Sequence, residues 1–165
     1  MENDFSTDEI ERFIGNRLSL SLSTINLQHE QVVSYAPFVH SDDKTFYIFI
    51  SELAEHTQNL NYAIKNGHKT SIMLIEDEKE CQNIFARKRL NYLCNVELIE
   101  RESEQWQQVL AIFREKFDQT IEVLMTLPDF KLFSLSARNG KFVSGFAKTY
   151  LYNGVGWSLY EHKKT

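Results

Sequence analysis

The chain is poor in cysteine, proline and glycine, and each shortage narrows the classes of site and fold that it can contain. Its 165 residues include two cysteines, two prolines and six glycines. Cys81 and Cys94 are too few and too far apart to form a zinc-ligand set or a disulfide framework, so we expect reduced thiols with no catalytic role. The sequence has no glycine-rich nucleotide loop, HExxH motif, paired-carboxylate set, Ser-His-Asp set or Cys-His set. Hydrolytic and NAD-linked chemistry are therefore without support.

Positive charge and long apolar runs are lacking as well. The formal net charge of -5 argues against a general nucleic-acid binder, which is normally basic overall or over one broad face. No apolar run approaches the length that spans a bilayer, and the acidic residues 1–13 lack the basic-then-apolar pattern of a signal peptide. We therefore expect a cytoplasmic protein that binds neither nucleic acid nor membrane. Without a linker, an internal repeat or a low-complexity tract, residues 1–165 are expected to form one domain.

Aromatic residues are plentiful, at 13% of the chain, and with so few prolines they indicate a β-rich core. From Leu18 to Thr24 leucines alternate with serines and threonine, which is typical of a strand with one buried face. Further strands are predicted at residues 32–39, 45–51, 70–75, 86–101, 129–136 and 141–152. Segment 45–51 has no polar alternation, so both of its faces are expected to be covered. Pro37 is expected at an edge, a bulge or a strand end, and Asn139-Gly140 predicts a hairpin between the last two strands.

Helices are predicted in the connections. Residues 6–9 have the form of a capping box and predict a helical segment over residues 6–16. Leu53 to Lys65 predicts a second helix that Gly67 ends, and Ser103 caps a third whose apolar face continues until Pro128. Residues 79–85 are expected to form a helical turn and residues 153–165 a short basic tail. This order predicts a mainly β fold with connecting helices, an antiparallel barrel that is closed or split, because closure removes exposed strand edges.

Three consecutive cations follow an acidic run near the middle of the chain. The predicted strand 70–75 leads into Glu76, Asp77, Glu78 and Glu80, and the chain returns through residues 87–89, which are Arg, Lys and Arg. Such a concentration of positive charge beside a core suits an anionic small ligand, because a guanidinium grips an oxyanion with two donors. The alternative is a solvated strand edge that is kept charged to prevent edge-to-edge pairing.

One of the five histidines is placed to serve a site near these cations. His56 follows the strand predicted at 45–51, and together with Ser51 and Asn59 it is expected to face a ligand at the corner near Arg87 and Arg89. A helix that begins there also offers free backbone N–H groups to an anion. The alternative is a partly buried structural histidine that bonds a backbone carbonyl. The histidines at 29, 40 and 68 carry less signal, because they lie in predicted turns or at a strand end.

The last histidine lies in the basic tail. His162 is followed by Lys163 and Lys164. A tail of this kind is able to bring an imidazole over a flat cofactor as an axial iron ligand, with the lysines near the anionic propionates of a haem.

Six strings in the sequence resemble the haem-utilisation proteins of the HugZ/HutZ type. They are VSYAPFV (33–39), ISELAEHTQNL (50–60), SIMLIEDE (71–78), FARKRL (85–90), DFKLF (129–133) and KFVSGFAKTY (141–150), and the resemblance spans residues 18–150. These proteins belong to the pyridoxamine-5′-phosphate-oxidase-like group with an FMN-binding split barrel. The resemblance implies a six-stranded antiparallel split barrel and a homodimer whose ligand cleft lies between the two subunits. Members bind haem, and some degrade it with oxygen and an external electron donor to release iron.

The resemblance also implies residue roles. In this family a histidine of the C-terminal tail is the axial haem ligand, and an aspartate of the other subunit supports it. The aspartate matches Asp129 in DFKLF, an arginine important near the haem matches Arg89 in FARKRL, and the tail histidine loosely matches His162. By the same resemblance Arg87 and His56 become expected site residues.

Haem binding with oxygen-dependent haem degradation is the function that this resemblance implies. A haem carrier without turnover and an FMN-binding oxidoreductase are the alternatives. Against FMN, the segment FYIFISELAEH (46–56) lacks the basic residues that phosphate-binding members place there.

Overall fold

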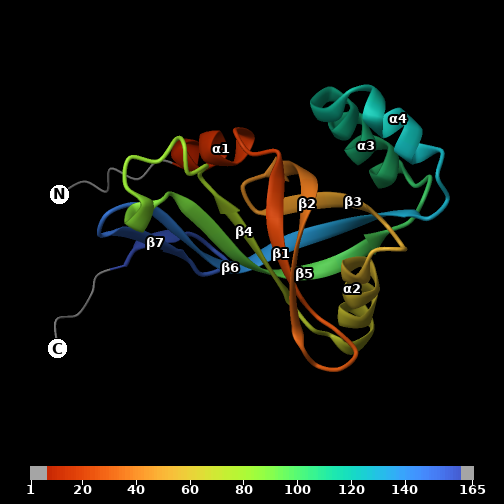
Figure 1. The fold of residues 1–165 in the computed structure, drawn as a ribbon, viewed down its shortest axis with the longest axis horizontal. Helices are drawn as coiled ribbons and strands as arrows, with labels where there is room; N and C mark the ends of the chain where they lie inside the picture. Colours follow the sequence, from red (N-terminus) through yellow and green to blue (C-terminus); the bar gives the residue numbers. More distant parts are fainter. Residues whose placement is uncertain (1–6, 161–165) are drawn as a thin grey trace.

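The computed structural model describes residues 7–160, which form one antiparallel sheet with helices in its connections (Figure 1). The elements are α1 (Thr7–Gly15), β1 (Ser19–Ile25), β2 (Gln31–Asp42), β3 (Thr45–Ser51), α2 (Glu55–Asn66), β4 (Thr70–Ile75), the 3-10 turn η1 (Ile84–Ala86), β5 (Arg89–Ile99), α3 (Glu104–Phe117), α4 (Gln119–Met125), β6 (Phe130–Gly145), β7 (Lys148–Tyr152) and β8 (Trp157–Leu159). The strand order is β3-β2-β1-β4-β5-β6-β7-β8, and a further pairing of β3 with β6 closes β1 to β6 into a barrel. The predicted six-stranded antiparallel barrel is confirmed.

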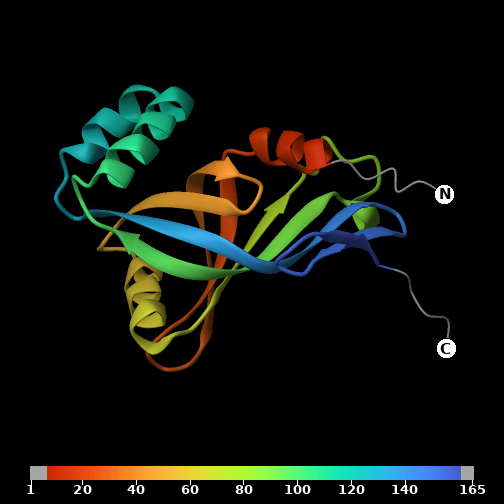
Figure 2. The same cartoon turned by 180° about the vertical axis from the view of Figure 1, so that it is seen from behind.

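The barrel is filled by the inward side chains of its strands, and a second core lies outside it. In β3, Phe46 and Ile48 belong to the inner core, whereas Tyr47 and Phe49 pack with Trp106 and its neighbours on α3. The prediction that both faces of segment 45–51 are covered is thus confirmed. Figure 2 shows from behind that α1 and the α3–α4 pair lie on one side of the barrel and α2 on the other. None of the helices between residues 7 and 160 is long and apolar enough to cross a membrane.

A half-buried lysine joins α3 to the barrel. The Nζ of Lys116 donates hydrogen bonds to the backbone carbonyls of Arg17 at 2.8 Å and of Phe38 at 3.0 Å. The same ammonium lies 4.1 Å from the centroid of the Phe38 ring, within the range of a cation–π contact. Burial lowers the pKa of Lys116 to about 8. The lysine therefore holds the C-terminal end of α3 against the start of β1 and the middle of β2.

Several local predictions are confirmed. Gly67 follows α2 with a φ of 67°, which is the left-handed conformation expected of it. Ser103 caps α3 by accepting a hydrogen bond from the backbone N–H of Trp106. Pro37 lies at the end of the β1–β2 ladder, directly before Phe38 begins the pairing of β2 with β3. Because β2 changes partner at this point, the missing N–H of proline is tolerated.

The predicted hairpin at Asn139-Gly140 is wrong. Both residues lie inside the continuous strand β6, and the chain reverses instead after Gly145, through Phe146 and Ala147. Gly140 faces the ring of Tyr92 on β5, and a Cβ at this position would lie 2.2 Å from Tyr92 Cδ1. The glycine therefore allows an aromatic ring to approach the neighbouring backbone, which is a different use of glycine from a turn.

Three helix and tail predictions also need correction. The apolar segment after Ser103 forms two helices, because Asp118 adopts a φ of 49° between α3 and α4. Leu53, predicted to begin α2, lies in the preceding turn with 86% of its surface exposed. The predicted tail contains β8, which pairs with β7. The first helix is confirmed as α1, but its predicted cap at Ser6 lies outside the described residues.

Candidate ligand-binding site

The predicted site residues fall into two groups at opposite ends of the barrel. Ser51 pairs with Phe130 at the start of β6, whereas Arg89 pairs with Val143 close to its other end. At about 3.3 Å per residue, the stretch of strand between these two pairs measures roughly 40 Å. In Figure 1, α2 lies at one end of the barrel, and the short unlabelled green turn below α1, which is η1, lies at the other. The prediction that Ser51, His56 and Asn59 face the corner of Arg87 and Arg89 is therefore wrong within one protomer.

At the α2 end, the turn after β3 holds Asp129 in place. The Oγ of Ser51 donates to Oδ2 of Asp129 at 2.5 Å and accepts a hydrogen bond from the backbone N–H of Leu53 at 3.1 Å. The backbone N–H of Glu52 donates to the carbonyl of Asp129 at 2.7 Å. An O–H···O⁻ bond of this length is among the stronger hydrogen bonds of proteins. The carboxylate of Asp129 is thus fixed beside the last residue of β3.

His56 lies at the same end, in the first turn of α2. Its Nδ1 is 3.1 Å from the Oγ of Ser34 on β2. Burial lowers the pKa of His56, so the neutral imidazole, the form that can bind a metal, is favoured. The partner is a hydroxyl and not the backbone carbonyl of the structural alternative. The contribution of Ser34 was missed, because a serine in a predicted strand carries no functional signal of its own.

Asn59 has a structural role. Its side chain is buried, and its Nδ2 donates to the Oγ1 of Thr24 on β1 at 3.0 Å. This bond joins α2 to the barrel wall. A buried amide that is already paired in this way is occupied, so Asn59 does not offer its side chain to a ligand.

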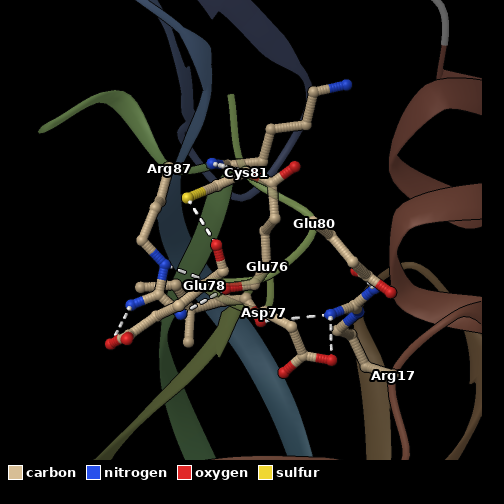
Figure 3. A network of polar contacts seen from close by, with 9 residues as sticks. Arg17, Glu76, Asp77, Glu78, Glu80, Cys81 and Arg87 are labelled. Carbon is tan, nitrogen blue, oxygen red and sulfur yellow. Dashed lines mark hydrogen bonds and ion pairs between the residues drawn. The ribbon is translucent and has the colours of Figure 1, made fainter. Parts of the chain in front are cut away.

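At the η1 end, the acidic run engages two arginines, Arg87 and Arg17 (Figure 3). The guanidinium of Arg87 donates twice to the backbone carbonyl of Glu76, through Nε at 2.9 Å and through Nη2, and its Nη1 lies 3.6 Å from Glu78. Arg17, which precedes β1, is bound to the same loop through an ion pair in which its Nη2 lies 2.9 Å from Oε2 of Glu80. The Arg87 side chain is only 19% exposed, so the solvated-edge alternative does not describe it. Arg87 fixes the loop and is not free to grip an oxyanion.

Arg89 differs from Arg87. Its Nη1 donates to the backbone carbonyl of Arg87 at 3.1 Å, and no carboxylate of residues 7–160 forms an ion pair with it. Lys88, between the two arginines, lies 3.4 Å from Glu9. Of the three consecutive cations, Arg89 is therefore the one whose charge is left for a ligand.

The candidate residues do not line the well-formed surface cavities of one protomer. Several cavities of about 280 to 680 Å³ between residues 7 and 160 are lined by residues other than Ser51, His56, Arg87, Arg89 and Asp129. The same five residues are each partly exposed.

Comparison with known proteins places the chain in a family. Residues 6–144 match the family model of pyridoxamine 5′-phosphate oxidase. The chain belongs to the pyridoxamine 5′-phosphate oxidase family. This family member is 41% identical over 146 residues to the heme oxygenase HutZ of Vibrio cholerae, an alignment that covers 88% of this chain and 80% of HutZ.

Solved structures of this family resemble the chain throughout the barrel. The crystal structure of HutZ from Vibrio cholerae, described as a heme storage protein, has a TM-score of 0.70 at 40% identity and covers 79% of this chain and 88% of its own. The structure of Campylobacter jejuni ChuZ has a TM-score of 0.84 at 31% identity and covers 99% of this chain and 68% of its own.

The chemistry of the candidate residues suits haem, although one protomer does not bring them together. Asp129 supplies a fixed carboxylate, His56 a neutral imidazole and Arg89 a cation that pairs with no carboxylate of the described residues. These are the groups that support an iron-ligating imidazole or bind a propionate. The predicted axial ligand His162 and its neighbour Lys163 lie outside the described residues.

Proposed function

We propose that this member of the pyridoxamine 5′-phosphate oxidase family binds haem and degrades it in an oxygen-dependent reaction that releases iron. The observation that carries the proposal is the 41% identity over 146 residues to heme oxygenase HutZ. The fixed carboxylate of Asp129 and the guanidinium of Arg89, which pairs with no carboxylate within residues 7–160, support it, because they supply a partner for a ligating imidazole and a partner for a propionate.

The proposed site needs a second copy of the chain, because Arg89 and Asp129 lie at opposite ends of one barrel. In a homodimer whose two-fold axis runs across the barrel, the partner's strands point the other way. The Arg89 end of one copy then lies beside the partner's Asp129. Two equivalent sites form, each with residues from both copies.

The outer face of β1 is the surface that we propose for this contact. β1 lies between β2 and β4, and it directs Ser19, Ser21 and Ser23 outward. Beside this row of small side chains, β2 exposes Val33 (75%) and Tyr35 (68%). Small residues let two sheets approach closely, and exposed large apolar residues next to them are typical of an interface.

In the proposed dimer the chain's own residues bind, orient and supply charge. Asp129 accepts a hydrogen bond from the distal N–H of the ligating imidazole, which fixes the ring and makes it more electron-rich. Arg89 would bind a propionate of the haem, and Lys163, which follows His162 in the sequence, would assist it. The imidazole is assigned to His162, with His56 as the second candidate. When bound, haem supplies the redox chemistry with oxygen, and an external electron donor supplies electrons.

The test is a haemin titration of the apo protein followed by absorbance, with His162→Ala and His56→Ala variants and an FMN control. We expect a stoichiometric Soret band that His162→Ala weakens or shifts. Ascorbate under air should bleach this band with formation of a biliverdin-type product. Absence of haemin binding, with tight binding of FMN, would overturn the proposal in favour of an FMN-binding oxidoreductase.

A haem carrier without turnover is the second candidate. It is favoured by the description of the similar Vibrio cholerae structure as a heme storage protein. A carrier keeps its Soret band under ascorbate and air and passes haemin intact to an acceptor protein such as apomyoglobin. The bleaching experiment therefore separates the two functions.

A further inference from the structure

Ser51 is the centre of the hydrogen bonds around Asp129. Its hydroxyl donates to Asp129 Oδ2 at 2.5 Å and accepts from Leu53 N–H at 3.1 Å, and its carbonyl accepts from the hydroxyl of Thr57 at 2.6 Å. Ser51 is also the last residue of β3 and pairs with Phe130 of β6. Side chain and backbone are therefore both held, and the hydroxyl has a single direction in which to donate.

This arrangement leaves Asp129 with one occupied and one available oxygen. Oδ2 is bonded to Ser51, and within residues 7–160 the other oxygen, Oδ1, has no hydrogen-bond or ion-pair partner. Lys131, two residues further along the chain, is the cation nearest in sequence. Its ammonium lies 3.3 Å from the carboxylate of Glu52, and no ion pair with Asp129 is present among residues 7–160.

We propose that Ser51 is a positioning residue: it fixes the Asp129 carboxylate so that Oδ1 alone faces the N–H of the haem-ligating imidazole, while Glu52 keeps Lys131 from occupying that oxygen. This inference rests on the proposed function. It differs from the expectation that Ser51 itself contacts the cofactor. Without the hydroxyl, Asp129 rotates freely about its side-chain bonds, both oxygens exchange, and the imidazole loses a fixed acceptor.

The first test needs no haem. A hydroxyl proton held in a short O–H···O⁻ bond resonates downfield, so it is sought by proton NMR of the apo protein at low temperature, where exchange with water is slowest. We expect one such signal in the wild-type protein and in Ser51→Thr, and its loss in Ser51→Ala and in Asp129→Ala. Ser41→Ala, at an exposed serine of β2, is the matched control and keeps the signal. A spectrum without this signal, or a signal that survives in Ser51→Ala, would refute the hydrogen bond from Ser51 to Asp129 on which the inference depends.

The second test uses the haem-loaded protein and measures the iron–histidine stretching frequency of the ferrous form by resonance Raman. A carboxylate that bonds the distal N–H strengthens the iron–histidine bond, so Asp129→Asn lowers the frequency. We expect Ser51→Ala to lower it in the same direction and to weaken haemin binding about tenfold, the lower end of the loss found for such outer partners. Ser51→Thr, which keeps a hydroxyl, should retain the wild-type stretching frequency and the wild-type haemin affinity. Glu52→Gln, which frees Lys131, also lowers the frequency.

The outcomes separate this inference from the proposed function. If the wild-type protein fails to bind haemin, the proposed function is wrong, and Ser51 has no imidazole to serve. If haemin binds and Asp129→Asn lowers the frequency but Ser51→Ala does not, positioning by Ser51 is refuted while the haem site stands. A frequency unchanged in Asp129→Asn refutes the inference as well, because Asp129 is then not the partner of the imidazole. Thermal unfolding of each variant shows whether the barrel is intact.

Discussion

Replacing Gly140 by alanine should destabilise the protein strongly, although the change adds one methyl group. The new Cβ would lie 2.2 Å from Tyr92 Cδ1 and 2.6 Å from the backbone carbonyl oxygen of Asn91. The Tyr92 ring is 1% exposed and is surrounded by other aromatic rings, so it has no space in which to move. Overpacking of a tight core typically costs 1 to 3 kcal/mol, and a clash with both ring and backbone places Gly140→Ala near about 3 kcal/mol.

Urea unfolding followed by circular dichroism measures this loss. Gly15→Ala is the matched control, because no atom lies within 4 Å of the added Cβ, and we expect its stability to change by less than about 1 kcal/mol. Tyr92→Val should remove the part of the penalty that arises from the ring, so the double variant Tyr92→Val with Gly140→Ala is more stable than the sum of the single effects predicts. A turn at Asn139-Gly140 would give additive effects, because its cost arises from backbone conformation alone. Strict additivity would refute the strand packing described above.

Three further predictions concern the contact between α3 and the barrel, the cations of the candidate site and the proposed dimer interface. Lys116→Met should cost about 1 to 2 kcal/mol at pH 7, because two backbone carbonyls lose their donor. Burial lowers the pKa of Lys116 to about 8, so between about pH 8 and the ordinary pKa of lysine the unfolded chain binds more protons than the folded protein. The free energy of unfolding of the wild-type protein should therefore rise with pH through this window. Urea titrations of Lys116→Met should not show this rise. Arg89→Ala should weaken haemin binding about tenfold, as expected for the loss of a charge-assisted bond of about 1.4 kcal/mol. Arg87→Ala should mainly lower the unfolding temperature and change haemin affinity less than Arg89→Ala does. If Arg87→Ala weakened haemin binding more than Arg89→Ala, the assignment of Arg89 as the ligand-binding cation would be wrong. Ser21→Arg should convert the proposed dimer to a folded monomer that has lost haemin affinity, and a variant that sediments as a dimer and binds haemin normally would place the interface elsewhere.

The sequence predicted the barrel well because its strands carry local signals. Alternating leucine and serine marked β1, and the unbroken apolar run of β3 indicated a strand covered on both faces. The same local logic failed at Asn139-Gly140, because the reason for that glycine is the ring of Tyr92, which is distant in sequence. A dipeptide pattern contains no information about the side chain that will press against it.

Sequence patterns name candidate residues for the site, but they do not show how these residues are arranged. Asp129 and Ser51 were both named, but their hydrogen bond joins residues that only the β3–β6 pairing makes adjacent. Arg87 and Arg89 looked equivalent in the sequence, and they differ because the acidic loop binds Arg87 but not Arg89. The separation of the two groups follows from the length of β6, which no local pattern reveals.

The length of β6 separates the two halves of the proposed site, and this has a consequence for dimers that contain two different variants. In the proposed dimer each site takes its arginine from one copy and its aspartate from the other. A mixed dimer of an Arg89→Ala copy and an Asp129→Ala copy therefore contains one site that lacks both groups and one site that lacks neither. Two variants that are each defective alone should complement one another when they are unfolded and refolded together, with half of the sites in every mixed dimer restored.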